Sequence, residues 1–308
     1  MFESEAYIRY LAAKKYVDDR ALNRRVWQTL KSNLPSTNQR KKLDVVEFGA
    51  GIGTMFQRSI AWELSPHFNY TMVEKNSDYL TAFRSQAFQS RQSSDFTLAW
   101  QNNTHADVNF TGGDGSIEIV CADLYDVISN HNNYRRWDLI IAHAVMDLVN
   151  INDVLTGFEQ LVKPGGLLYL SLNYDGLTLF LPSFDPDFEH HLLERYHDSM
   201  DQRIIGGRPS GSSRSGRVLF SLLIQRKLPI LATGSSDWIV YPQAQGYLDQ
   251  DATFLEAILQ TIKEAMHHDN QLDPRRLAAW INHRKAQINS AELLFMARNI
   301  DFLVKPTT

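Results

Sequence analysis

The stretch Val45-Val46-Glu47-Phe48-Gly49-Ala50-Gly51-Ile52-Gly53 decides the fold of this chain. It predicts a buried strand that breaks into a glycine-rich turn, and Thr54–Ala61 can begin a helix behind that turn. The three glycines remove side chains where a ligand would approach the backbone, and the helix points its unpaired N–H groups at that ligand. The carboxylate of Glu47 would oppose a polyphosphate, so the turn favours a ligand that carries positive charge nearby.

The turn resembles motif I of the class I S-adenosylmethionine-dependent methyltransferases, E/D-x-G-x-G-x-G, and matches it in full. A dinucleotide fingerprint, G-x-G-x-x-G, would need glycine where Thr54 or Phe56 stands. The resemblance implies S-adenosylmethionine as the cofactor and S-adenosylhomocysteine as its product. It implies methyl transfer to an O, N, C or S nucleophile of a small molecule. It also places five residues of the turn against the cofactor: Glu47, Gly49, Ala50, Gly51 and Gly53.

Composition limits the possible partners. The chain has 308 residues, is 44% hydrophobic and 21% charged, and carries a net charge of -4, so no global basic field attracts nucleic acid or anionic lipid. Its one cysteine, Cys121, rules out an internal disulfide, argues against a thiolate metal site and fits a reducing compartment. No apolar run approaches the ~18 residues of a membrane helix. We expect a cytoplasmic monomer or homodimer with a small-molecule methyl acceptor, and without a metal, a nucleic-acid partner or a membrane partner.

Alternating segments predict an α/β fold with a parallel sheet. Its predicted strands are Leu43–Phe48, Asn69–Glu74, Ile117–Cys121, Trp137–Ala142 and Leu167–Leu172. Ile230–Tyr241 and Leu293–Val304 would add an edge pair, one strand of it antiparallel, and Phe96–Trp100 could be a short extra strand. By the resemblance, this is a doubly wound, mostly parallel, seven-stranded Rossmann-like sheet with an antiparallel edge hairpin.

Helical spacing predicts one N-terminal helix over residues 5–31, which the polar run after Pro35 would end. The other predicted helices are Ser77–Gln89, Asp153–Val162, Arg217–Lys227, 252–268 and 274–289. Residues 174–216 interrupt the alternation with prolines, aromatic residues and a Gly/Ser/Arg run. We expect a helical cap (1–42) and a methyltransferase domain (43–308). The domain would divide into a cofactor half (43–173), an inserted substrate lid (174–216) and a C-terminal sheet half (217–308).

Two acids follow predicted strands in the cofactor half. Glu74, with Lys75 beside it, ends the second strand, where a carboxylate can accept both ribose hydroxyls. The alternative is a solvated acid paired with Lys75. By the resemblance, Asp123 accepts from the adenine amino group and the backbone N–H of Leu124 donates to a ring nitrogen. The alternative is that Asp123 caps a helix.

His143 and Asp147 follow the fourth strand, whose carboxyl end borders the ligand site in this fold. His143 could line the cofactor pocket, accept a proton from the nucleophile as a catalytic base, or have neither role. Asp147 could lie near the methyl donor or could cap a helix. An Asn/Asp-Pro-Pro-Tyr run is absent from the sequence, which argues against methylation of DNA or glutamine amides.

The inserted segment holds candidate substrate residues. Arg208 and Arg214 could clamp a carboxylate or phosphate, or could be solvated charges at a helix start. Tyr174 and other aromatic residues could form a lid over a flat substrate or the insertion's own core. Other activities stay open: an RNA or protein methyltransferase, a cofactor-binding protein without catalysis, and a nicotinamide oxidoreductase.

Overall fold

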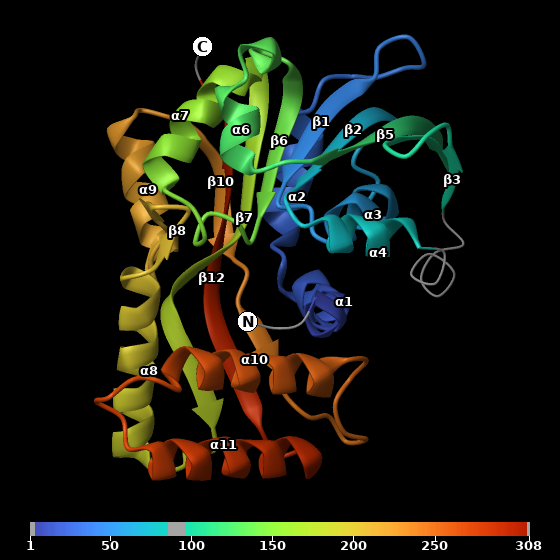
Figure 1. Cartoon of the computed structure of the whole chain (residues 1–308). Coiled ribbons are helices and arrows are strands. Elements are labelled where there is room, and N and C mark those ends of the chain that lie inside the picture. Colours follow the sequence, from blue (N-terminus) through green and yellow to red (C-terminus); the bar gives the residue numbers. More distant parts are fainter. Residues whose placement is uncertain (1–3, 86–95, 307–308) are drawn as a thin grey trace.

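A computed structural model describes residues 4–85 and 96–306 (Figure 1). Its large sheet contains β1 (Leu43–Phe48), β2 (His67–Glu74), β3 (Phe96–Trp100), β4 (His105–Phe110), β5 (Gly113–Cys121), β6 (Trp137–His143), β7 (Val162–Leu181), β10 (Ile230–Ser235), β11 (Trp238–Val240) and β12 (Leu294–Val304). The strand order is β10-β12-β7-β6-β1-β2-β5-β4-β3, and β11 pairs with β12. A separate small hairpin pairs β8 (Ile204–Ile205) with β9 (Arg208–Pro209).

The centre of the sheet is a doubly wound, Rossmann-like arrangement. Strands β5, β2, β1, β6 and β7 pair in parallel, β12 runs antiparallel to β7, and β10 runs antiparallel to β12. These seven strands confirm the expected fold class. The predicted total of seven was wrong for the whole sheet, because β3, β4 and β11 raise it to ten. The predicted extra strand Phe96–Trp100 is confirmed as β3.

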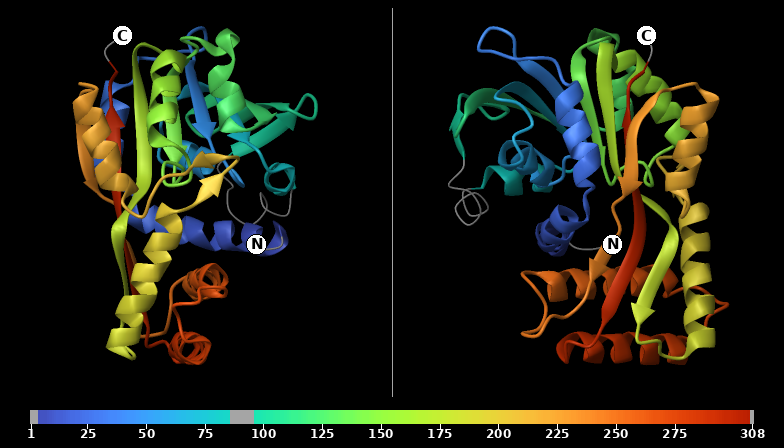
Figure 2. Two further views of the ribbon diagram at one scale, coloured as in Figure 1. Left: turned by 60° about the vertical axis from the view of Figure 1, so that its left-hand side comes forward. Right: turned by 180° about the vertical axis from the view of Figure 1, so that it is seen from behind.

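Helices cover both faces of this sheet (Figures 1 and 2). They are α1 (Ser4–Ala21), α2 (Arg24–Asn33), α3 (Thr54–Ala61), α4 (Ser77–Arg84), α6 (Leu124–Ser129), α7 (Ile151–Leu161), α8 (Pro186–Asp201), α9 (Ser215–Gln225), α10 (Asp251–Met266) and α11 (Pro274–Asn289). Apolar side chains of α2, α3 and α4 pack on one face, and those of α6, α7 and α9 pack on the other. The predicted end of α4, residues 86–89, lies outside the described residues. Within 4–85 and 96–306, no helix has the length and apolarity that crossing a membrane requires.

The N-terminal segment forms two helices, so the prediction of one helix over 5–31 was wrong. Asn23 starts the second helix, because its side chain accepts hydrogen bonds from the N–H groups of Arg25 and Val26. The backbone N–H of Asn23 also donates to Asp301 in β12 (3.0 Å). This bond ties the junction between α1 and α2 to the sheet.

Strand β7 continues well past its predicted end at Leu172. Residues as far as Leu181 pair with β12, so the predicted insertion at 174–216 begins as a strand. Figure 2 shows β7 and β12 leaving the main sheet as a two-stranded arm beside α8, α10 and α11. A third hydrophobic cluster holds this arm and α1 together, including Val17, Phe180, Phe254, Trp280 and Phe295.

Candidate functional site

A cavity of about 570 Å³ lies at the carboxyl ends of the central parallel strands. Strand β1 lies between β2 and β6. The chain continues from β1 to β2 on one side and returns to β6 on the other, so the strand order reverses here, and ligands of open α/β sheets bind at such a reversal. Most of the predicted site residues line this cavity: Glu47, Gly49, Ala50, Gly51, Glu74, Lys75, Asp123, Leu124, His143, Tyr174 and Arg208. Gly53 and Arg214 are not among its lining residues.

The glycine turn is shaped by close packing. Gly49 has φ +68°, and a Cβ there would lie 2.6 Å from Cγ2 of Val145. Gly53 has φ +76°, and a Cβ there would lie 2.4 Å from the ring of Phe83. Both positions therefore need glycine, on conformational and on steric grounds. Gly53 directly precedes α3 and packs against the side chains of Phe83 and Met72, whereas Gly49 and Gly51 border the cavity.

Glu47 is a buried carboxyl beneath the turn, with 2% of its surface exposed. The hydroxyl of Tyr70 donates to its Oε2 (2.8 Å). Burial raises the pKa of Glu47 to about 8, although the Tyr70 hydrogen bond and the nearby Arg58 lower it. A cation that enters the cavity would favour the ionised form of this group.

Glu74 binds the backbone of the glycine turn directly. Its Oε2 accepts the N–H of Gly51 (3.0 Å), and its Oε1 accepts the N–H of Asn76 (2.9 Å). Lys75 is exposed where it lines the cavity. One amide of the turn therefore already faces a carboxylate, which adds negative charge where a dinucleotide site would hold a phosphate.

Asp123 caps α6, because its side chain accepts the N–H of Tyr125 (2.9 Å). The capping alternative therefore holds, and Asp123 lines the cavity as well. The guanidinium of Arg208 lies 4.2 Å from the centre of the Tyr125 ring. The β8–β9 hairpin thus closes over the end of the cavity where Asp123 and Leu124 lie.

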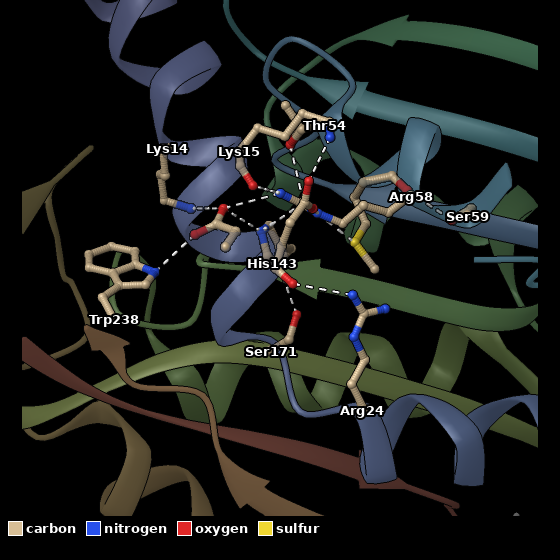
Figure 3. A network of polar contacts seen from close by, with 12 residues as sticks. Lys14, Lys15, Arg24, Thr54, Arg58, Ser59, His143, Ser171 and Trp238 are labelled. Carbon is tan, nitrogen blue, oxygen red and sulfur yellow. Dashed lines mark hydrogen bonds and ion pairs between the residues drawn. The ribbon is translucent and has the colours of Figure 1, made fainter. Parts of the chain in front are cut away.

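His143 belongs to a buried polar network (Figure 3). Its Nδ1 lies 2.9 Å from Ser171 Oγ, and its Nε2 lies 3.1 Å from Asp18 Oδ2 and 3.3 Å from Arg58 Nη1. Burial lowers the pKa of His143 to about 4, against the opposing effect of its bond to Asp18. The ring is therefore neutral near pH 7, and both its nitrogens already face protein groups.

Sequence reasoning missed Asp18 at the centre of this network. Its carboxylate binds Lys14 Nζ (2.6 Å), accepts from Trp238 Nε1 (2.9 Å) and lies 3.5 Å from Arg58. Burial alone would raise its pKa, but Lys14, the His143 hydrogen bond and Arg58 hold the pKa well below its usual range. The one sequence signal was the i,i+4 spacing of Lys14 and Asp18, which is ordinary on any helix.

Only some of the candidate substrate residues line the cavity. Tyr174 lines the cavity, and its hydroxyl lies 2.7 Å from both Thr178 Oγ1 and His197 Nε2. Arg214 is exposed at the start of α9, and its backbone N–H donates to Ser212. Arg203, which had no predicted role of its own, lines the cavity instead.

No family model matches the chain, and no curated protein matches it. Similar solved structures include a protein from Anaeromyxobacter dehalogenans described as a type II methyltransferase, with 13% identity over 92% of this chain and 96% of that one (TM-score 0.48). Others are the cyclopropane synthase MmaA2 from Mycobacterium tuberculosis (10% identity, 91% and 82% covered, TM-score 0.41) and geranyl diphosphate C-methyltransferase from Streptomyces coelicolor A3(2) (7% identity, 91% and 77% covered, TM-score 0.42). These likenesses are too weak to support a function by themselves.

Proposed function

We propose that this protein is an S-adenosylmethionine-dependent methyltransferase that acts on a small molecule. The observation that carries the proposal is the pair of carboxyl groups at the glycine turn: Glu74 accepts the N–H of Gly51, and Glu47 lies buried beside it. A pyrophosphate over this turn would meet negative charge, whereas a sulfonium cofactor with an ammonium group would be attracted. The full match to the motif I pattern supports the same cofactor.

The cavity walls fit the parts of such a cofactor. Glu74 would accept from the ribose hydroxyls, and Asp123 with the Leu124 N–H would meet the adenine edge. Glu47 would favour the ammonium of the methionine part, and the surfaces of Gly49 and Gly51 would let the chain lie close. These roles agree with the positions of the acids at the ends of β1, β2 and β5.

The cofactor supplies an electrophilic methyl group on sulfur, so the protein mainly has to orient the reactants and exclude water. Orientation can account for about 7–11 kcal/mol of a reaction barrier. We propose that His143 lines the site as a neutral ring, because Ser171, Asp18 and Arg58 occupy its nitrogens. The alternative of His143 as a catalytic base would require these contacts to break.

Three further assignments belong to the same proposal. The cap (1–42) and the inserted segment (174–216) would close the cavity over the acceptor, since Tyr10, Tyr174 and Arg203 all line it. Arg208 would cover the adenosyl end through its contact with Tyr125. We propose a cytoplasmic monomer or homodimer without a nucleic-acid partner, in keeping with the net charge of -4.

Binding calorimetry tests this function. We expect the purified protein to bind S-adenosylmethionine and S-adenosylhomocysteine and to have no measurable affinity for NADH. Labelled methyl transfer to a metabolite pool would then identify turnover. Tight binding of NADH with neither adenosyl ligand bound would overturn the proposal, and adenosyl binding without any transfer would favour a non-catalytic cofactor-binding protein.

Two single substitutions test the assigned cofactor contacts. Glu74→Ala and Asp123→Ala are each expected to weaken S-adenosylhomocysteine binding by about 1–3 kcal/mol, the range for losing a buried hydrogen bond. Asp123 also caps α6, so Asp273→Ala, which removes the cap of α11, is the matched control. Calorimetry should show unchanged affinity for the control. Unchanged affinity in both test variants would remove these residues from the site.

A further inference from the structure

Asp147 lines the cavity, and one of its carboxylate oxygens has no hydrogen-bond partner in the part of the chain that the structure describes. Among the residues described, its Oδ1 is buried and meets no hydrogen-bond donor. An unsatisfied buried acceptor costs about 1–3 kcal/mol, and native proteins contain few of them. A ligand that brings an N–H or O–H group to this atom would remove that cost.

Several tyrosines line the same cavity as this carboxylate. Burial and, to a smaller extent, the charge of Asp147 raise the pKa of four tyrosines in the cavity lining: Tyr7, Tyr10, Tyr174 and Tyr196. They come from α1, β7 and α8, so three elements contribute tyrosine rings to the cavity lining. A carboxylate in a cavity lined by aromatic rings favours an organic cation, because the carboxylate and the ring faces both carry negative charge.

Two basic side chains face the same place, and both are engaged. Lys14 is paired with Asp18 at 2.6 Å. Arg203 donates from Nη2 to the backbone carbonyl of Asp147 (2.5 Å) and from Nε to Ser210 (3.0 Å). Burial raises the pKa of Asp147, and Arg203 and then Lys14 act against this. Both of these charges favour the ionised form of the carboxylate.

The backbone holds Asp147 in place from two sides. Arg203 binds its carbonyl, and Gly211 packs so closely that a Cβ there would lie 2.5 Å from the carbonyl oxygen of Met146. Asp147 follows β6 in the same loop as Val145, which contacts the glycine turn at Gly49. A substrate nucleophile bound to the Asp147 carboxylate would therefore lie in the same cavity as the methyl donor.

We propose that the methyl acceptor is an amine and that Asp147 binds its nitrogen and accepts its proton. This inference rests on the proposed methyltransferase function. A new N–C bond forms as the methyl–sulfur bond breaks, and sulfur keeps that electron pair. The proton that nitrogen loses passes to the Asp147 carboxylate, so charge and atoms balance.

Matched ligand pairs test the assignment. Wild-type protein saturated with S-adenosylhomocysteine is titrated with a panel of amines and alcohols of equal carbon skeleton, such as phenethylamine and 2-phenylethanol. We expect an amine to bind at least about tenfold more tightly than its alcohol, which is about 1.4 kcal/mol. Asp147→Asn should abolish that preference and leave the alcohol unaffected. Asp153→Asn, an exposed acid nearby on α7, should behave as wild type.

The outcomes separate this inference from the proposed function. If the wild type does not bind S-adenosylhomocysteine, the methyltransferase proposal itself fails. If it binds that ligand but shows no preference for any amine, or if Asp147→Asn keeps the preference, only the amine assignment fails. If Asp147→Asn does not fold, the comparison of amine and alcohol binding to the wild-type protein decides the question by itself. Transfer of labelled methyl to an amine, and none to its alcohol, would complete the support.

Discussion

Replacing Asp18 with alanine is expected to lower the free energy of unfolding by about 3–5 kcal/mol, the range for removing one partner of a buried ion pair. The side chains of Asp18, Lys14 and Arg58 are 2%, 9% and 1% exposed, so their charges cannot be compensated by water. Without Asp18, Lys14 would remain buried without its carboxylate partner. Arg58 would keep Asp19 as its carboxylate partner, and Trp238 would lose the acceptor for its indole N–H.

Urea denaturation near pH 7 measures this loss. Glu5→Ala is the matched control, because Glu5 and Arg9 form a pair with the same i,i+4 spacing on the same helix, and their side chains are 85% and 68% exposed. Exposed pairs contribute about 0–1 kcal/mol. If Asp18→Ala and Glu5→Ala lower the free energy of unfolding equally, the network around His143 does not stabilise the packing of the N-terminal helices on the sheet.

The pH dependence of this loss has a definite sign. The folded pKa of Asp18 lies below the ordinary value of 3.8 for this group, so the carboxylate contributes stability above that pH, and the contribution is lost as the pH falls further. The difference between wild type and Asp18→Ala should therefore stay constant above about pH 5 and shrink below about pH 4. His143, with its pKa lowered to about 4, should add acid sensitivity between about pH 6.5 and 4, because the unfolded chain binds its proton more readily.

Local sequence signals were sufficient where one element carries the information. Strand β1 runs from Leu43 to Phe48 as predicted. A buried, mainly apolar run ends there at glycines, whose positive φ angles suit a turn and not a strand. The strand-end acids Glu47, Glu74 and Asp123 share one cavity because parallel strands bring their carboxyl ends to one edge. These features follow from periodicity and topology without knowledge of side-chain contacts.

Long-range contacts were not predictable in the same way. Asp18 and His143 meet across 125 positions, and nothing in either local pattern indicates the other. The continuation of β7 was hidden by Asp175 and Gly176, which are typical of a turn. In the structure Gly176 has φ +70° at an irregularity in the pairing with β12, and the pairing resumes at Thr178. Asn23 could have been recognised as a helix start, since asparagine is among the preferred cap residues.

The second large effect concerns Glu47. Glu47→Gln is expected to stabilise the cofactor-free protein by about 2–4 kcal/mol near pH 7 and to weaken S-adenosylmethionine binding. Burial raises the folded pKa to about 8 from 4.5, so the folded state takes up a proton that the unfolded chain releases. Stability therefore falls as the pH rises from about 4.5 to 8, and glutamine removes this loss while it can still accept from the Tyr70 hydroxyl.

Unfolding in urea across about pH 5 to 9 would show the stabilisation growing with pH and levelling off above about pH 8. Tyr70→Phe is the informative companion, because the Tyr70 hydrogen bond lowers the pKa of Glu47, so its loss should move the transition upward. A glutamine variant that is less stable than wild type at pH 8 would contradict the assignment.

Cofactor binding should show the opposite preference. If the ammonium of S-adenosylmethionine favours ionised Glu47, binding near pH 7 releases a proton, and calorimetry in two buffers of different ionisation enthalpy would detect it. Wild-type affinity should then rise from about pH 5 to 7, where the cofactor's α-amino group stays protonated, whereas the affinity of Glu47→Gln should vary little over that range. The cost of burying Glu47 in the cofactor-free protein would then be offset by stronger binding of the cationic cofactor. If the affinities of wild type and Glu47→Gln were both independent of pH, Glu47 would have no role in cofactor binding.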